Sequence, residues 1–240
     1  MKRLVKNARL GSAFWAAVVA ALSLLMAPAI GSRAGAADAK TVPDPRPILQ
    51  ELQRKMSAVR TVYLEFTQER HLKLFAEPLK SEGVMLIERP DQIRWETTQP
   101  YQSILIGRKK AVAQFEFEDG KWKKLRAGFP QLKKVMEQMS LMHQGKIDAL
   151  TSDFTVSVAT NSMTIITLEP KDENVRSMLS SIQIHLLPDL SSTRQVVMLE
   201  PSGDLTKIVF TKEMRDVNFP PGTFDLDKPI PLGGIRAVKQ

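Results

Sequence analysis

The stretch SEGVMLIERPDQIRWETTQPYQSILI, residues 81–106, decides the fold. It predicts three successive β-strands separated by turns at Pro90 and Pro100, because proline fixes φ and disfavours helix at the residue before it. The middle strand alternates apolar and polar side chains, which is typical of one dry and one wet face. Its dry face would carry Ile93 and Trp95, and its wet face Gln92, Arg94 and Glu96.

Strands of the same kind are expected along most of the chain. Val62, Leu64 and Phe66 alternate with polar side chains before this stretch, and Asp119-Gly120 after it is typical of a hairpin turn. Short spacings between strands favour antiparallel connections, and the alternation favours a sheet with one apolar face. We therefore expect an α+β, mainly β fold: an antiparallel, unclosed half β-barrel of about eleven strands, with helices covering its concave apolar face.

Two helical regions interrupt the strands. The first is expected over residues 47–59, where apolar side chains recur every three or four positions. The second lies within residues 129–150 and carries a broad apolar stripe made of Leu132, Val135, Met136, Met139 and Met142. Methionine is flexible and is over-used where a surface adapts to varied apolar partners, so this stripe is either core or ligand contact.

The first 36 residues have the features of a secretory signal peptide. They hold five basic residues and no acid, followed by an apolar stretch and the small-residue site Ala34-Gly35-Ala36. We expect cleavage after Ala36, leaving a soluble, exported, single-domain protein of residues 37–240. Subtracting these five bases from the net charge of +8 leaves +3, which removes most of the case for nucleic-acid binding.

Residues for catalysis or metal binding do not form a recognisable constellation. The chain has no cysteine, which excludes disulfides, thiolate metal sites and a lipid-modified N-terminal cysteine. Its three histidines stand at unrelated positions, and we find no nucleophile elbow, no glycine-rich phosphate loop and no metal-ligand spacing. We expect a non-enzyme without cofactor or metal, although a hydrolase with a dispersed site stays as a third alternative.

Several blocks, in order, closely resemble the LolA family of periplasmic lipoprotein carriers. Within residues 81–106 these are Ser81-Glu82-Gly83, Arg89-Pro90, Trp95, Gln99-Pro100 and Ile104-Leu105-Ile106. The first helix, the strand around Phe66-Thr67-Gln68 and the tail from Val217 to Pro229 extend the resemblance over most of residues 37–240. After Ile106 the chain departs from the family pattern, with Gly107-Arg108-Lys109-Lys110 in place of an Asp-Gly turn.

The resemblance implies a monomeric periplasmic carrier that holds the acyl chains of a lipoprotein, or of a related lipid, in an apolar cavity and delivers it to the outer membrane. It also implies an inner-membrane ABC-type releasing complex and an outer-membrane acceptor as partners. A regulatory or sensor domain, or a glycolipid-binding domain, on the same half-barrel is the alternative function. The expected ligand and lid residues are Leu64, Phe66, Arg89, Trp95, Leu132, Val135, Met136, Met139 and Met142.

Arg89 has two interpretations. The resemblance implies that its side chain bonds backbone carbonyls of a lid helix and helps to hold the empty pocket closed. By itself, an arginine before a proline turn is equally compatible with a solvated surface side chain.

Overall fold

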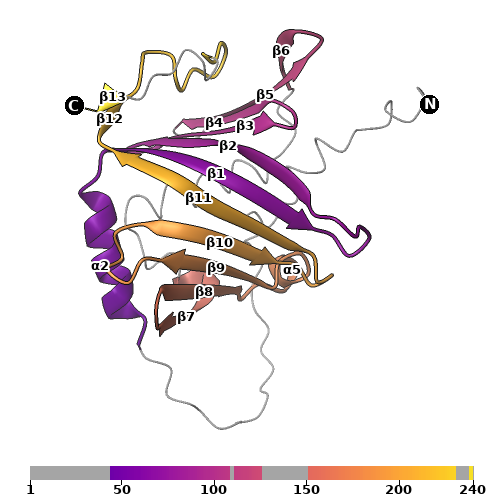
Figure 1. Ribbon diagram of the computed structural model, residues 1–240. Helices are drawn as coiled ribbons and strands as arrows, with labels where there is room; N and C mark the ends of the chain where they lie inside the picture. The colour runs from indigo at the N-terminus through magenta and orange to yellow at the C-terminus, as the bar shows by residue number, and fades with distance from the viewer. Residues whose placement is uncertain (1–43, 109–110, 126–150, 231–237, 240) are drawn as a thin grey trace.

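The computed structural model describes residues 44–108, 111–125, 151–230 and 238–239. Its main feature is one eleven-stranded sheet in which every neighbouring pair is antiparallel (Figure 1). The strand order is β6-β5-β4-β3-β2-β1-β11-β10-β9-β8-β7, so β6 and β7 are edge strands and the sheet does not close. The strands are β1 (Thr61–His71), β2 (Leu79–Glu88), β3 (Gln92–Gln99), β4 (Ser103–Arg108), β5 (Ala111–Glu118), β6 (Lys121–Lys124), β7 (Phe154–Thr160), β8 (Thr164–Pro170), β9 (Ser181–Leu186), β10 (Thr193–Leu199) and β11 (Leu205–Arg215).

Three of the expected turns occur where the sequence places them. The β2–β3 and β3–β4 turns contain Pro90 and Pro100, each after a cis peptide bond. The β5–β6 hairpin turns at Asp119 and Gly120, which have φ values of 53° and 75°. Both central residues of a tight hairpin turn of this kind need positive φ, which explains the Asp-Gly pair.

Helices α2 and α5 accompany the sheet, and residues 151–153 are also helical. Helix α2 (Arg46–Ser57) has Pro47 in its first turn and two basic residues, Arg54 and Lys55, in its last turn, where they face the negative end of the helix dipole. It begins and ends one or two residues before the predicted bounds of 47–59. Helix α5 (Glu173–Arg176) was not predicted; the Asp172 carboxylate caps it by accepting from the backbone N–H groups of Asn174 and Val175.

The pairing of β1 with β11 joins two halves of the chain that lie far apart in the sequence. Both strands have eleven residues and pair from Val62 with Arg215 to His71 with Leu205 (Figure 1). A β-bulge between Glu65 and Phe66 shifts the register. This contact makes β1–β6 and β7–β11 one surface.

The sheet has two packed faces, which we call inner and outer. The inner face carries Leu64, Phe66 and Trp95, and α2 packs on it through Ile48, Leu49 and Leu52. The outer face of β2–β5 carries a second apolar cluster, covered by residues 219–230. Its members are Val84, Leu86, Ile104, Ile106, Ala113, Phe115 and Phe224, with Tyr63, Trp122, Phe219, Leu226 and Ile230 packed against them.

The expected wet face of β3 is therefore wrong. Arg94 is 0% exposed and Glu96 is 4% exposed, because the C-terminal segment lies over this side of the strand. The expectation of a single apolar face fails over β2–β5 for the same reason. Local alternation cannot reveal a segment that returns to a strand from more than a hundred residues away.

Arg94 fastens that segment to the sheet. Its guanidinium donates to the Glu96 carboxylate, with Nε–Oε2 and Nη2–Oε2 distances of 2.9 and 2.5 Å. It also donates to the backbone carbonyls of Thr223 at 2.8 Å and Ile230 at 2.6 Å. Burial lowers the pKa of Arg94, while Glu96 opposes that shift. The ion pair is thus buried and shared between sheet and tail. The short strands β12 (Val217–Asn218) and β13 (Val238–Lys239) pair on either side of this segment.

We predict that Arg94→Met lowers the free energy of unfolding by about 3–5 kcal/mol, because it leaves the Glu96 carboxylate buried without its cation. The double variant Arg94→Met/Glu96→Leu should recover much of this loss, since it removes both charges. Urea unfolding followed by circular dichroism measures the effect. Equal urea midpoints for wild type and Arg94→Met would contradict the role assigned to this pair.

Candidate functional site

The inner face is a continuous apolar surface that spans both halves of the sheet. Directly opposed residues of paired strands point to the same side, so the pairing register places the apolar residues of neighbouring strands in cross-strand rows. One row runs through Leu64, Met85, Trp95 and Leu105. The surface continues across β11–β7 through Phe210, Ile208, Val196, Met198, Ile182, Ile184, Ile166, Leu168, Val156 and Val158.

Three of the expected site residues lie together on this face. Leu64 and Phe66 are 7% and 2% exposed, and Trp95 is half-buried beside them. The rings of Phe66 and Trp95 lie with centroids 4.3 Å apart and planes inclined by 39°. The structure therefore brings Leu64, Phe66 and Trp95 into one aromatic and aliphatic group at the centre of the inner face.

Gly83 makes room for this group. It pairs with Phe66 across β1 and β2, and a Cβ atom there would lie 2.9 Å from Cζ of Phe66 and 1.9 Å from the backbone oxygen of Glu96. A side chain at this position would have to displace the backbone of β3 and also the Phe66 ring. Close packing against β3 and Phe66 thus explains why the third residue of Ser81-Glu82-Gly83 is a glycine.

Helix α2 is tied to the sheet at its C-terminal end from two sides. Arg89, in the β2–β3 turn, donates from Nη2 to the backbone carbonyl of Met56. Carbonyls in the last turn of a helix lack intrahelical partners and favour a nearby cation. Burial lowers the pKa of Arg89, but an arginine starts high enough to stay charged. Whether this contact works as a latch stays a prediction.

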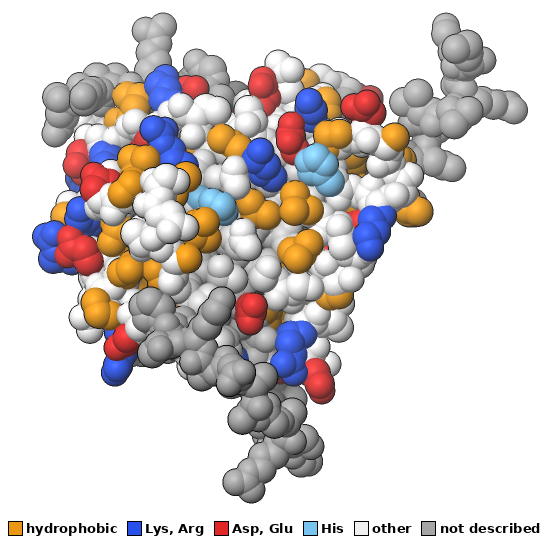
Figure 2. Space-filling model, turned by 60° about the horizontal axis from the view of Figure 1, so that its bottom comes forward, with side chains coloured by type: hydrophobic (Ala, Val, Ile, Leu, Met, Phe, Trp, Pro, Cys, Tyr) orange, Lys and Arg blue, Asp and Glu red, His pale blue; other side chains and the backbone are white. Residues whose placement is uncertain are grey.

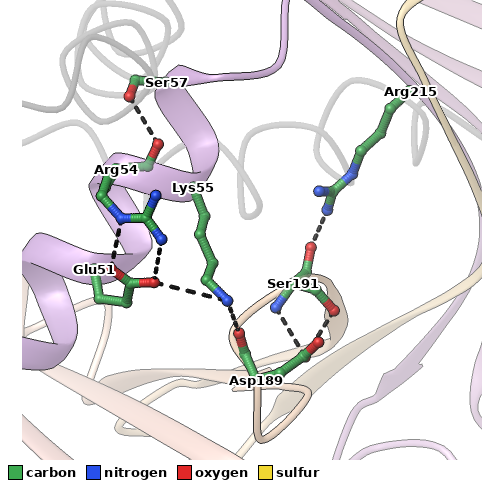
Figure 3. Close-up of polar contacts among 7 residues, drawn as sticks. All are labelled: Glu51, Arg54, Lys55, Ser57, Asp189, Ser191 and Arg215. Atoms are coloured by element: carbon green, nitrogen blue, oxygen red, sulfur yellow. Dashed lines mark hydrogen bonds and ion pairs between the residues drawn. The ribbon is translucent and has the colours of Figure 1, made fainter.

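The second tie connects α2 with the β9–β10 loop (Figure 3). Nζ of Lys55 donates to the backbone oxygen of Asp189 at 2.5 Å. Asp189 in turn accepts from the backbone N–H and the hydroxyl of Ser191 at 3.0 and 2.7 Å, which fixes the loop. Arg215, at the end of β11, donates to the backbone oxygen of Ser191. The loop is therefore a fixed anchor for the helix.

Sequence reasoning missed Lys55 and Arg215. Lys55 lies among the polar residues of the predicted first helix, where a basic residue needs no further explanation. Its partner is a backbone oxygen 134 positions away, and no sequence pattern reports such a contact. The five other expected residues, Leu132, Val135, Met136, Met139 and Met142, lie outside the described residues.

Partial burial shifts the pKa values of two polar groups near the β3–β4 turn. It raises the pKa of the Glu116 carboxyl, and the neighbouring Glu118 adds to this. It raises the pKa of the Tyr101 hydroxyl too, with Glu116 adding to the shift and Arg70 opposing it. Desolvation is the largest cause in both cases.

On the side of the molecule that Figure 2 draws, apolar side chains are interspersed with acidic and basic ones. Within the described ranges, no group of three or more His, Cys, Asp or Glu side chains could hold a metal ion. None of the helices described is long and apolar enough to cross a membrane.

An open antiparallel sheet with an apolar inner face under a tethered helix defines the class of protein. Residues 57–227 match the family model described as outer membrane lipoprotein carrier protein LolA, and this match covers more than half of the 240 residues. The chain therefore belongs to the LolA family. Both the resemblance found in the sequence and the expected unclosed, mainly β fold are confirmed.

Individual relatives are more distant. An outer-membrane lipoprotein carrier protein of Legionella pneumophila (strain Lens) is 25% identical over 194 residues, which cover 79% of this chain and 88% of that protein. A solved DUF1329 family protein from Desulfovibrio piger has a TM-score of 0.42 at 9% identity, covering 76% of this chain and 98% of its own. A putative outer membrane lipoprotein-sorting protein domain from Vibrio parahaemolyticus has a TM-score of 0.40 at 9% identity, covering 74% and 95%.

We predict that Gly83→Ala lowers the free energy of unfolding by about 1–3 kcal/mol through overpacking against β3 and Phe66. The double variant Gly83→Ala/Phe66→Leu should show whether the aromatic ring contributes to this clash, since a smaller side chain relieves only that part. Thermal unfolding of the wild type, Gly83→Ala, Phe66→Leu and the double variant measures the energetic coupling between positions 83 and 66. An unchanged melting temperature for Gly83→Ala would contradict the close approach.

Proposed function

We propose that this protein is a periplasmic carrier that covers the acyl chains of a lipoprotein, or of a related lipid, on its apolar inner face and delivers the cargo to the outer membrane. The observation that carries this proposal is the continuity of the apolar inner face across β1–β3 and β7–β11, beneath a helix held by a few polar contacts. Membership of a family named for lipoprotein carriers supports the choice of cargo.

The physical need for such a surface is large. An acyl chain in water costs about 0.8 kcal/mol per CH₂, so a chain of roughly 16 carbons costs on the order of 12 kcal/mol. Unassisted transfer between two membranes would be prohibitively slow at that cost. A carrier has only to replace water around the chain with apolar side chains, and it performs no chemical step. We therefore assign the protein a non-catalytic role.

Reversible covering requires a part of the fold that opens. Helix α2 suits this because only Leu49 of its residues is buried, while Ile48 and Leu52 are half-buried against the inner face. A typical hydrogen bond contributes about 1 kcal/mol net, and about 1.5–3 kcal/mol when one partner is charged. The Arg89 and Lys55 contacts are thus strong enough to favour the closed position and weak enough to be exchanged for cargo.

The remaining parts of the proposal rest on the sequence and on the family. Residues 1–36 would direct export and be removed, and residues 37–240 would act as a monomeric single domain in the periplasm. An inner-membrane ABC-type complex would load the cargo, and an outer-membrane acceptor would receive it. The apolar stripe at 132–142 would complete the cover of the inner face.

Native mass spectrometry of the protein purified from the periplasm of its own host tests the proposal. We expect a fraction of the protein to carry an acylated lipoprotein or lipid that delipidation removes. Val196→Asn, which places an amide on the half-buried inner face of β10, should reduce this fraction, whereas Thr67→Asn on the exposed side of β1 should not. Bare protein in repeated preparations, with no uptake of added lipopeptide, would refute the carrier role.

We predict that Arg89→Leu loads cargo but releases it poorly. Removing the bond to the Met56 carbonyl raises the open, binding-competent fraction, and apparent affinity rises with that fraction. One charge-assisted bond corresponds to about a tenfold change in affinity. A handover assay from the loaded protein to acceptor-containing vesicles measures the release.

Arg89→Lys is the matched control, because a lysine still donates to a helix carbonyl and should retain most of the transfer. Circular dichroism establishes that both variants fold. Transfer by Arg89→Leu at the wild-type rate would eliminate Arg89 as a latch, while leaving the carrier function itself intact.

A further inference from the structure

The inner face changes from apolar to polar at one end of four strands. Along β1, Leu64 and Phe66 are followed by Gln68, and along β3, Ile93 and Trp95 are followed by Thr97. On β4 and β5 the same step separates Leu105 from Ser103 and Val112 from Gln114. We call Gln68, Thr97, Ser103 and Gln114 the polar belt. It lies toward the β1–β2 loop, whereas the Arg89 contact with α2 is at the other end of these strands.

The pairing register puts the belt on the same side as the apolar surface. Thr97 pairs with both Gly83 and Ser103, and Gly83 pairs with Phe66. Gln114 pairs with Leu105, which pairs with Trp95. Because opposed residues share a face, the belt borders the Phe66–Trp95 group directly. It is the polar continuation of the inner face.

Three belt side chains are deeply buried and lack partners for their polar atoms. Gln68, Ser103 and Gln114 are 3%, 1% and 6% exposed. Within the part of the chain that the structure describes, Nε2 of Gln68, Oγ of Ser103 and Nε2 of Gln114 have no hydrogen-bond partner. Buried polar groups are normally paired, and burying them unpaired is unfavourable. The three residues lie in successive cross-strand rows of this face, with Gln114 opposite Leu105, Ser103 opposite Thr97 and Gln68 opposite Ser81. Three such atoms at one end of an apolar surface indicate a ligand that brings acceptors.

The chemistry of the belt selects among acceptors. A glutamine amide nitrogen donates two hydrogen bonds and a serine hydroxyl donates one, and none of the three groups carries a charge. The acidic side chain of Glu116 stands opposite Ser103, which disfavours an anionic ligand. Neutral donors suit a neutral acceptor. An ester or amide carbonyl at the head of an acyl chain is such a group. The acyl chain itself would then lie along the adjoining apolar inner face.

We propose that Gln68, Ser103 and Gln114 donate hydrogen bonds to the ester or amide carbonyls at the head of the acyl chains, which fixes the direction of the cargo. The chain ends lie toward Ile87 and Ile93, and the head group leaves toward the β1–β2 loop. This inference rests on the carrier function proposed above. The shared chemistry is the acyl carbonyl, whether it comes from a lipopeptide or from a glycerophospholipid.

Paired ester and ether probes test the inference. The probes are a dipalmitoyl lipopeptide, S-[2,3-bis(palmitoyloxy)propyl]-Cys-Ser-Lys₄, its bis(hexadecyloxy) ether analogue, and dipalmitoyl phosphatidylethanolamine with its own diether. Displacement of an anilinonaphthalene-sulfonate dye gives the affinities. We expect the wild type to bind an ester probe about tenfold more tightly than its ether, as one or two hydrogen bonds imply. Whichever ester probe binds more tightly, the lipopeptide or the phosphatidylethanolamine, identifies the class of cargo.

Gln68→Met and Gln114→Met keep side-chain volume and remove the donor. Each should lower ester affinity about fivefold and leave ether affinity unchanged. Each should also raise the melting temperature of the empty protein, by about 2–4 °C, because an unpaired buried amide has been removed. Gln183→Met is the matched control, since Gln183 alternates with inner-face Ile182 and Ile184 and is half-buried on the opposite face of β9. It should leave the ester preference unchanged.

The outcomes separate the inference from the carrier function. Equal binding of ester and ether by the wild type would overturn the belt assignment and leave the carrier role standing. Equal loss of both ligands in the belt variants, with a lower melting temperature, would make these residues structural and also overturn it. Failure of the wild type to bind any of the four probes would reject the carrier role together with the belt.

Discussion

The antiparallel pairing of β1 with β11 is the contact on which the rest of the molecule depends. It brings Val62 beside Arg215 and Phe66 beside Phe210, so residues from opposite ends of the folded chain share one surface. Closing so long a loop carries an entropic cost, which the two longest strands offset with an extended ladder and with buried side chains on the inner face. Without this pairing, the apolar rows of β1–β3 and β8–β10 would be two separate half-surfaces.

The two faces of the sheet then take different roles. The outer face of β2–β5 is covered by the C-terminal segment, which Arg94 of the buried Arg94–Glu96 pair fastens through two backbone carbonyls. The inner face is covered at one end by α2, through contacts that join single side chains to backbone oxygens. In the carrier function that we propose, a cover that opens is best built from a few such contacts, since each can be exchanged for ligand at a modest cost. The buried Arg94–Glu96 ion pair is unsuited to opening, because separating its partners leaves a charge in an apolar site.

The sequence predicted the strands well and their surroundings poorly. The proline and Asp-Gly turns and the alternation of Leu64 and Phe66 are local signals, and each corresponds to a strand or turn in the structure. Arg94 and Glu96 follow the same alternation, yet they are buried, because the segment that covers them comes from residues 219–230. Helix α5 was missed because its four residues are too few to show a helical period, and its only local signal is the cap at Asp172.

The sequence by itself determined the family, the strand-rich character and the positions of the turns, because these depend on neighbouring residues and on short spacings of side-chain type along this chain. Only the tertiary structure decided which polar residues are buried, which backbone oxygens Arg89 and Lys55 contact, and where the inner face turns from apolar to polar. Gln68, Ser103 and Gln114 are ordinary polar residues in three separate segments of the sequence. Strand register alone places them on one face, in successive rows at the same end of the sheet, because each cross-strand contact is set by the pairing of separate segments of the chain.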